Sequence, residues 1–222
     1  MEIRTAFHRQ LQETHNDVLF MGSMVEKAIL SSVKALKERD LGLAEQIIVD
    51  DRNINAKRFE IENKCIQLIA TQQPMAGELR VIMAVAYVIT ELERIGDYAE
   101  GIAKIVLMIG NEPPLKPLVT IPRMAEKTVD MLHRSLEAFI KHDADAARKI
   151  AAEDDEVDRL YDELYRVLIN FMVEDPKTIT RATRLIWVSH NLERAADRVT
   201  NICERVVFMA TGKMEEIGAS KY

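Results

Sequence analysis

The sequence contains few of the residues that interrupt or cross-link a chain. Of its 222 residues, two are cysteines, eight are glycines and six are prolines, and aromatic residues make up 5%. This composition excludes a collagen-like chain, which needs many glycines, and a disulfide-dense secreted domain, which needs many cysteines. Cys65 and Cys203 lie on apolar helical faces, so we expect two buried thiols rather than a disulfide.

Long hydrophobic runs are also missing. The longest runs from Val81 to Ile89, about half of the roughly 20 residues that a membrane-spanning helix needs. The first ten residues, MEIRTAFHRQ, are polar and charged, unlike a secretory signal. The formal charge of −6 argues against a nucleic-acid partner, which selects basic surfaces. We therefore expect a cytoplasmic protein without membrane insertion.

The residues that dominate are those of long packed helices: Ala, Leu, Ile, Val, Glu, Lys and Arg. Apolar residues recur at spacings of three and four, and no segment shows the alternation of a strand. Asp40 and Asp143 stand where helix N-caps are expected. The sequence predicts an all-α fold with helices at about 5–38, 41–72, 76–110, 121–141, 144–174 and 177–211.

The two halves of the chain resemble each other. The pattern A-[LF]-x-x-x-D-x-x-x-A starts at Ala35 and again at Ala138, an offset of 103 residues. The pattern L-E-R-x-x-D starts at Leu92 and again at Leu192, an offset of 100. Self-similarity of this kind indicates repeated structural units. We predict two tandem antiparallel three-helix bundles, residues 1–110 and 121–222, joined by a proline-rich linker at 111–120.

Acidic residues in the first half fall at matched heights of a helical hairpin that turns at Pro74. Asp51 and Asp97 each lie 23 residues from Pro74, and Asn55 and Glu93 each lie 19 residues from it. Antiparallel neighbours at equal distances from their turn lie at equal heights. The hairpin therefore places these four polar side chains on one level, at the edge of the interface between the two helices.

The second half repeats the arrangement about Asp175 with four carboxylates, those of Asp154, Asp158, Glu193 and Asp197. Carboxylates that converge repel each other unless protons or a metal ion balance their charge. Ligands that are all oxygen suit Mg²⁺, Ca²⁺, Mn²⁺ or Fe. The first set has Asn55 in place of a fourth acid, so we expect it to bind a metal more weakly. His190, one turn before Glu193, is either an extra ligand or an ordinary surface or core histidine.

A simpler interpretation of the acids stays open. Like charges four residues apart on an exposed helix cost only about 0.2–0.5 kcal/mol, so a solvated acidic stripe could persist without a role. Arg94 and Arg194 could pair with Asp97 and Asp197, three residues on. An ancestral duplication would also preserve the pattern in both halves.

The motifs resemble those of the PhoU family. They are M-G-x-x-V from Met21, TQQPMAGELR from Thr71, LERIGD from Leu92 and LERAADR from Leu192. The resemblance implies two tandem three-helix bundles whose paired E(D)-x-x-x-D motifs hold metal, including multinuclear iron clusters. Mn, Mg, Ca and Zn are the alternatives to iron. Carried over, the motifs fall on Asp51, Asn55, Glu93, Asp97, Asp154, Asp158, Glu193 and Asp197, and Asn55 departs from the acidic pattern.

The resemblance also implies a function. Members of the family are accessory and regulatory proteins of high-affinity phosphate transport that restrain the transporter and the phosphate-starvation regulon. The implied partners are a phosphate-sensing histidine kinase, the transporter's ATPase subunit and a second copy of the chain. The alternatives are a carboxylate-bridged di-metal enzyme and a metal-free helical scaffold. Because the sequence has no E-x-x-H motif and no Walker-type loop, we expect a protein that is not an enzyme.

Overall fold

The computed structural model describes residues 2–217, which form helices joined by short connections. The described residues contain no β-strand, so the predicted all-α class is confirmed. The elements are α1 (Glu2–Glu38), α2 (Leu41–Gln72), α3 (Ala76–Ile109), α4 (Thr120–Lys141), α5 (Ala144–Ala151), α6 (Asp154–Glu174), the short 3₁₀ helix η1 (Pro176–Thr178) and α7 (Ile179–Thr211).

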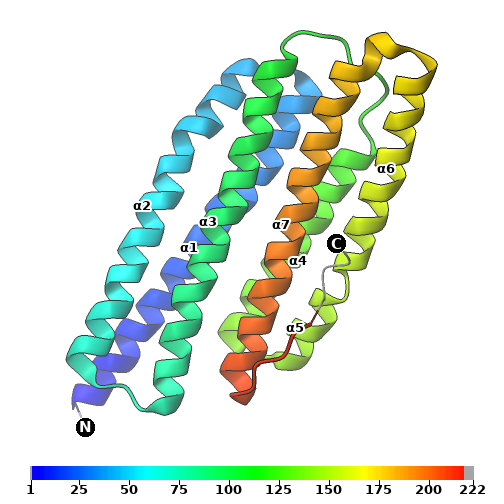
Figure 1. The fold of residues 1–222 in the computed structure, drawn as a ribbon. Helices are drawn as coiled ribbons and strands as arrows, with labels where there is room; N and C mark the ends of the chain where they lie inside the picture. The colour runs from blue at the N-terminus through cyan, green and yellow to red at the C-terminus, as the bar shows by residue number, and fades with distance from the viewer. Residues whose placement is uncertain (1, 218–222) are drawn as a thin grey trace.

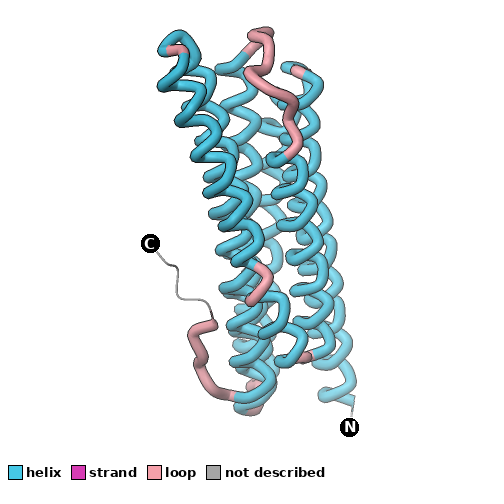
Figure 2. The backbone as a smooth tube through the Cα atoms, turned by 90° about the vertical axis from the view of Figure 1, so that its right-hand side faces the viewer, coloured by secondary structure: helices cyan, strands magenta, loops and turns pink. Residues whose placement is uncertain are grey.

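The helices form two antiparallel three-helix bundles that lie side by side (Figure 1). The first contains α1, α2 and α3, and the second contains α4, the α5–α6 pair and α7. The bundles meet where α3 packs along α7 and α1 packs along α4. Viewed from the side, the molecule is a long rod with its connections at the two ends (Figure 2). The buried apolar residues of both bundles form one continuous core. The limits 1–110, 111–120 and 121–222 stay a prediction.

The helices begin and end close to the predicted positions, and the caps explain where. The side chain of Asp40 accepts a hydrogen bond of 2.9 Å from the backbone N–H of Leu43. Asp143 accepts one of the same length from Ala146, so both predicted N-caps are confirmed. Arg39 and His142, one residue before each cap, adopt φ angles of 57° and 55°. This left-handed conformation ends one helix and allows the next to begin at once.

The predicted helix 144–174 is wrong in one respect, because the structure divides it at Ala152 and Glu153 into α5 and α6 (Figure 2). Five acidic residues crowd positions 153–158. Acids are disfavoured together inside a helix but stabilised at a helix N-terminus, where the backbone dipole is positive. The break gives α6 a first turn that begins with Asp154. Glu153 itself is held by two cations of α4, as described below.

Close approach of helices explains two of the glycines. A Cβ atom at Gly22 of α1 would overlap the side chain of Leu136 of α4. A Cβ atom at Gly101 of α3 would lie 3.0 Å from the Oδ1 atom of Asn191 on α7. Glycine therefore lets the two bundles pack against each other at both of their helix–helix contacts.

Cys65 and Cys203 are both free and buried, as predicted, and burial raises the pKa of each thiol to about 12. None of the described helices combines the length and apolar character needed to cross a membrane.

Candidate metal centre

The hairpin of α2 and α3 brings the first predicted set of polar residues together. The Oδ1 atom of Asp51 lies 3.6 Å from the position of a Cβ built on Gly96, directly before Asp97. Asn55 donates a hydrogen bond of 2.8 Å from Nδ2 to the Oδ2 atom of Asp51. Burial, followed by the charges of Asp97 and Glu100, raises the pKa of Asp51. The matched heights predicted for α2 and α3 are therefore present in the structure.

A cation enters this first set, which the sequence did not predict. The Nε atom of Arg58 lies 3.6 Å from the Oε2 atom of Glu93, and both side chains are partly buried. Partial desolvation by the surrounding protein, followed by the charges of Glu93 and Glu100, raises the pKa of Asp97. The set thus contains three carboxylates, one amide and one guanidinium. Its excess negative charge is small, which fits the expectation of weaker metal binding.

The second set is more buried and more acidic. Asp154, Asp158 and Asp197 are partly buried, and Glu193 is buried at 8% exposure. Arg194 donates a hydrogen bond of 2.9 Å to Asp197, as the simpler interpretation of the acids anticipated. In the second half Tyr161 stands 103 residues after Arg58, so no arginine occupies the equivalent place. The second set therefore keeps a larger excess of negative charge.

That excess changes the acidity of the carboxyl groups. Burial, followed by the charges of Asp158, Asp197 and Glu193, raises the pKa of Asp154 from 3.8 to about 7. Burial and the charge of Asp197 raise the pKa of Glu193 from 4.5 to about 7. Shifts of this kind mark sites where a proton or another cation is needed to balance converging acids.

The donor atoms of the second set fit a metal ion. The Oδ1 atom of Asp154 is buried and lacks a hydrogen-bond partner, and such atoms are rare in folded proteins. The Oε2 atom of Glu193 is also buried and accepts no hydrogen bond, although Nδ1 of His190 lies 3.2 Å from it. Hard cations would satisfy them. In the conformations seen, however, no three Asp, Glu, His or Cys side chains of residues 2–217 converge closely enough to ligate one ion. Coordination would therefore require carboxylate side chains to rotate.

His190 lies beside this set. Its Nδ1 atom is 3.2 Å from the Oε2 atom of Glu193, and its side chain is 54% exposed. Burial of the ring, together with the charge of Arg194, lowers the pKa of His190. Both interpretations of His190, an extra ligand and a surface histidine, remain open.

Sequence reasoning missed Glu91, which is buried at 4% exposure between α3 and α7. Its Oε2 atom accepts a hydrogen bond of 3.2 Å from Asn201 and lies 3.5 Å from Nη1 of Arg198. Burial raises the pKa of Asp197, and the charge of Arg198 offsets part of that rise, so Arg198 connects the second acidic set to α3 of the first bundle. The signal was the apolar run VIMAVAYVI, which ends two residues before Glu91 and places this stretch of α3 in the interior.

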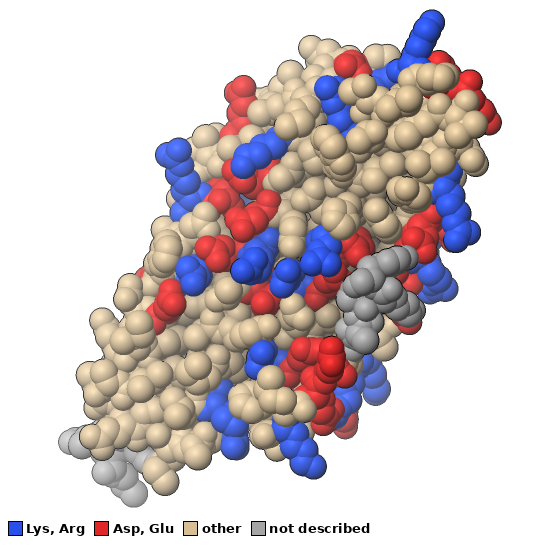
Figure 3. Space-filling view, viewed as in Figure 1, with Lys and Arg blue, Asp and Glu red and all other residues tan. Residues whose placement is uncertain are grey.

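Charged side chains gather at one level of the molecular surface. Figure 3 shows acidic and basic side chains gathered in a band across the middle of one face, over α2, α3 and α7. Below this band the lower left end of the same face carries few charges.

The fold and the paired acidic motifs define a class of protein: a helical protein built from two repeats, each with E-x-x-x-D on its third helix. A family model described as "PhoU domain" matches residues 18–106 and again residues 121–206. The chain belongs to the PhoU family.

Relatives with curated names support this membership. The phosphate-specific transport system accessory protein PhoU homolog of Clostridium acetobutylicum is 39% identical over 96% of this chain and 98% of the relative. The corresponding protein of Escherichia coli (strain K12) is 34% identical over 93% of this chain and 86% of its own length.

Solved structures agree. A phosphate transport system regulatory protein PhoU from Streptococcus pneumoniae has a TM-score of 0.88 at 32% identity, covering 95% of this chain and 99% of its own. PhoU from Pseudomonas aeruginosa has a TM-score of 0.88 at 34% identity, covering 93% of this chain and all of its own.

Proposed function

We propose that this protein is a metal-binding cytoplasmic regulator of phosphate uptake. In this role it restrains a high-affinity phosphate ABC transporter and represses the phosphate-starvation regulon through a sensor kinase. The chain's relatives are named as accessory proteins of the phosphate-specific transport system, and they align over nearly its full length. The transporter's ATPase subunit, the histidine kinase and a second copy of this chain are the proposed partners.

The observation that carries the metal-binding part of the proposal is the second acidic set. Asp154 and Glu193 each bury an oxygen that accepts no hydrogen bond, and neighbouring acids surround both. The first set also buries two such oxygens, those of Asp51 and Asn55, but there Arg58 lies beside Glu93 and Asn55 carries no charge. The metal therefore binds first and most tightly at Asp154, Asp158, Glu193 and Asp197. The proposed occupant is multinuclear iron, with Mn, Mg, Ca and Zn as alternatives.

We propose that the protein acts by binding rather than by catalysis. The relatives with curated names are called accessory proteins, and a solved structure of similar fold is called a regulatory protein. Metal in the second set would then fix the relative positions of α6 and α7. Proteins that bind to the outer faces of these helices would then meet a surface whose shape depends on the metal.

The test of the proposal uses the double variant Asp154→Asn/Asp197→Asn, which keeps the shapes of both side chains. Elemental analysis of anaerobically purified protein should show wild-type protein carrying metal and the variant losing most of it. In cells grown with ample phosphate, a phosphate-starvation reporter should be repressed by the wild-type protein and expressed with the variant.

The matched control is Glu163→Gln/Glu174→Gln, which removes two exposed carboxylates from the same helix α6. It should keep both the metal and the repression. Equal metal content in all three proteins would refute the metal site. Normal repression by a folded, metal-depleted variant would show that the regulation does not require the metal.

A further inference from the structure

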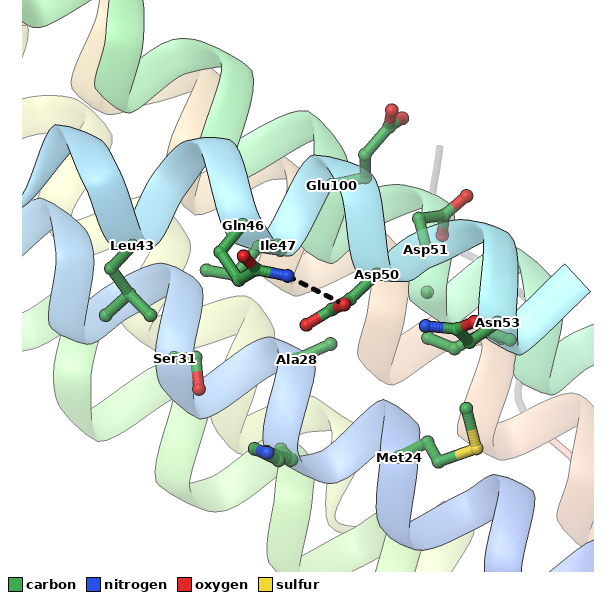
Figure 4. Close-up of a pocket in the computed structure, with 13 residues that line it drawn as sticks. Met24, Ala28, Ser31, Leu43, Gln46, Ile47, Asp50, Asp51, Asn53 and Glu100 are labelled. Carbon is green, nitrogen blue, oxygen red and sulfur yellow. Dashed lines mark hydrogen bonds between the residues drawn. The ribbon is translucent and has the colours of Figure 1, made fainter.

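A pocket of about 310 Å³ opens between α1 and α2 of the first bundle. Met24, Leu43 and Ile47 line it with apolar surface, and Asp50 contributes a carboxylate (Figure 4). Asp50 accepts a hydrogen bond of 2.9 Å from Gln46 on the same helix, and within residues 2–217 it forms no ion pair. A pocket of this size, apolar with a few polar groups, is typical of ligand sites.

The second bundle shows what fills the same place there. Glu153 lies 103 residues after Asp50, and Arg134 of α4 lies 103 residues after Ser31 of α1, which also lines the pocket. Arg134 donates two hydrogen bonds, of 2.8 and 2.6 Å, to the two oxygens of Glu153. This bidentate pair, together with Lys127, lowers the pKa of Glu153 to about 2. A guanidinium thus occupies, in the second bundle, the position that is open in the first.

The second cation that pairs with Glu153 also has no counterpart in the first bundle. Lys127 donates a hydrogen bond of 2.6 Å to Glu153, and Met24 stands 103 residues before Lys127. The first bundle therefore keeps the acid, Asp50, and replaces both of its cationic partners with short or apolar side chains. The pocket lies where side chains as long as those of Arg134 and Lys127 would otherwise stand.

From this internal comparison we propose that the pocket binds a guanidinium group on an aliphatic stem, which enters between α1 and α2 and pairs with Asp50. Planar guanidinium groups match carboxylates with two parallel hydrogen bonds. The methylene stem packs on Met24 and Leu43, as arginine stems do on apolar surface. Asp51 and Glu100 also line the pocket, but their carboxylates point away from α1 (Figure 4) and Glu100 pairs with Lys104 at 2.6 Å, so Asp50 supplies the attractive charge.

One residue of the pocket opposes a cation. Lys27 lines it and stands 103 residues before Asp130, which in the second bundle accepts a second contact of 2.7 Å from Arg134. Where the second bundle has the attractive carboxylate of Asp130, the pocket therefore has the repulsive ammonium group of Lys27. Affinity is limited by this lysine, and its removal tightens binding.

The source of the guanidinium is either a free small molecule or an arginine side chain of another protein. Two probes separate these sources: agmatine, which is free, and N-acetyl-arginine methylamide, which imitates arginine within a chain. Binding to full-length protein is measured by calorimetry and by chemical-shift changes of the Met24 methyl group. Binding of agmatine alone assigns the pocket to small molecules, and binding of the capped arginine alone assigns it to a protein partner.

Three variants test the assignment. Asp50→Asn should weaken binding of the better probe by about tenfold, because it removes a charge-assisted hydrogen bond. Lys27→Met should tighten binding several-fold. Ser31→Arg supplies the guanidinium from α1 itself, so it should abolish binding and raise the melting temperature. Glu45→Gln, an exposed change on α2 outside the pocket, should alter neither.

The proposal would be overturned if neither probe binds to the wild-type protein. It would also be overturned if binding survives in a folded Ser31→Arg protein. The reverse change gives an independent measurement. Arg134→Ser should open an equivalent pocket in the second bundle and lower the melting temperature. Agmatine should then raise the melting temperature of this variant part of the way back to that of the wild type. The absence of any such rescue in the folded variant would show that the place of Arg134 does not accept a free guanidinium.

Discussion

Replacing Asp154 with asparagine should stabilise the metal-free protein at pH 8. Burial and the neighbouring acids raise the pKa of this carboxyl group to about 7. The folded state therefore tolerates the protonated form better than the ionised one. Asparagine keeps the shape of a protonated aspartate and never ionises, so it removes the repulsion without leaving a hole.

The sign of the pH dependence follows from the same shift. Below the unfolded-state pKa, near 3.8, both states are protonated and Asp154 costs nothing. As the pH rises from there to about 7, the unfolded state gains stability by ionising, and the folded state does not. Above about pH 7 the cost is fully present.

The size of the effect can be bounded. A shift of about three pKa units corresponds to at most about 4 kcal/mol. Asp154 is partly exposed and shares the repulsion with three other acids, so solvent screening reduces the effect to about 1–2 kcal/mol. For a protein of this length that is a rise in melting temperature of about 3–6 °C.

Thermal melts followed by circular dichroism, with a chelator present, at pH 5.5 and pH 8 measure the effect. The difference between Asp154→Asn and wild type should be large at pH 8 and smaller at pH 5.5. Glu163→Gln, an exposed change on the same helix, should show no such difference. A variant that melts below wild type at pH 8, or shows the same difference at both pH values, would contradict the electrostatic reasoning.

Three further outcomes are expected. Arg134→Met should lower the free energy of unfolding, measured in urea, by about 1–3 kcal/mol, because Glu153 loses a bidentate partner; the loss should shrink as the pH falls from about 4.5 through 2, because Glu153 becomes protonated first in the unfolded state and then in the folded state. Gly22→Val should cost about 1–3 kcal/mol, because its side chain overlaps Leu136 of α4, whereas Gly77→Ala, with open space around it, should cost nothing. Both cysteines should resist a thiol reagent until urea unfolds the chain, since burial keeps their pKa values near 12; rapid labelling of the native protein would disprove their burial.

The helices and the level of the acidic residues could be predicted because both depend on local spacing. Asp40 and Asp143 identify helix starts from one residue each, and Pro74 fixes the heights of Asp51 and Asp97. The internal repeat then provides a second copy of each observation.

The rest depends on contacts between segments far apart in the sequence. The break at Glu153 involves Lys127 and Arg134 of α4, which no local pattern connects to it. The pairing of Arg58 with Glu93 depends on rotamers as well as on height. Side-chain direction is set by packing, so spacing alone placed the acids on one level but could not show that an arginine would join them.

The single core shared by α3 and α7 means that neither repeat is a finished molecule. A chain cut between α3 and α4 would yield two fragments, each with an exposed apolar face that the other fragment covers in the intact protein. Expressed separately, such fragments should aggregate or pair with themselves; produced together, they should reassemble into the native rod. Duplication of an ancestral three-helix unit would on this view have made permanent a contact that once formed between two separate chains.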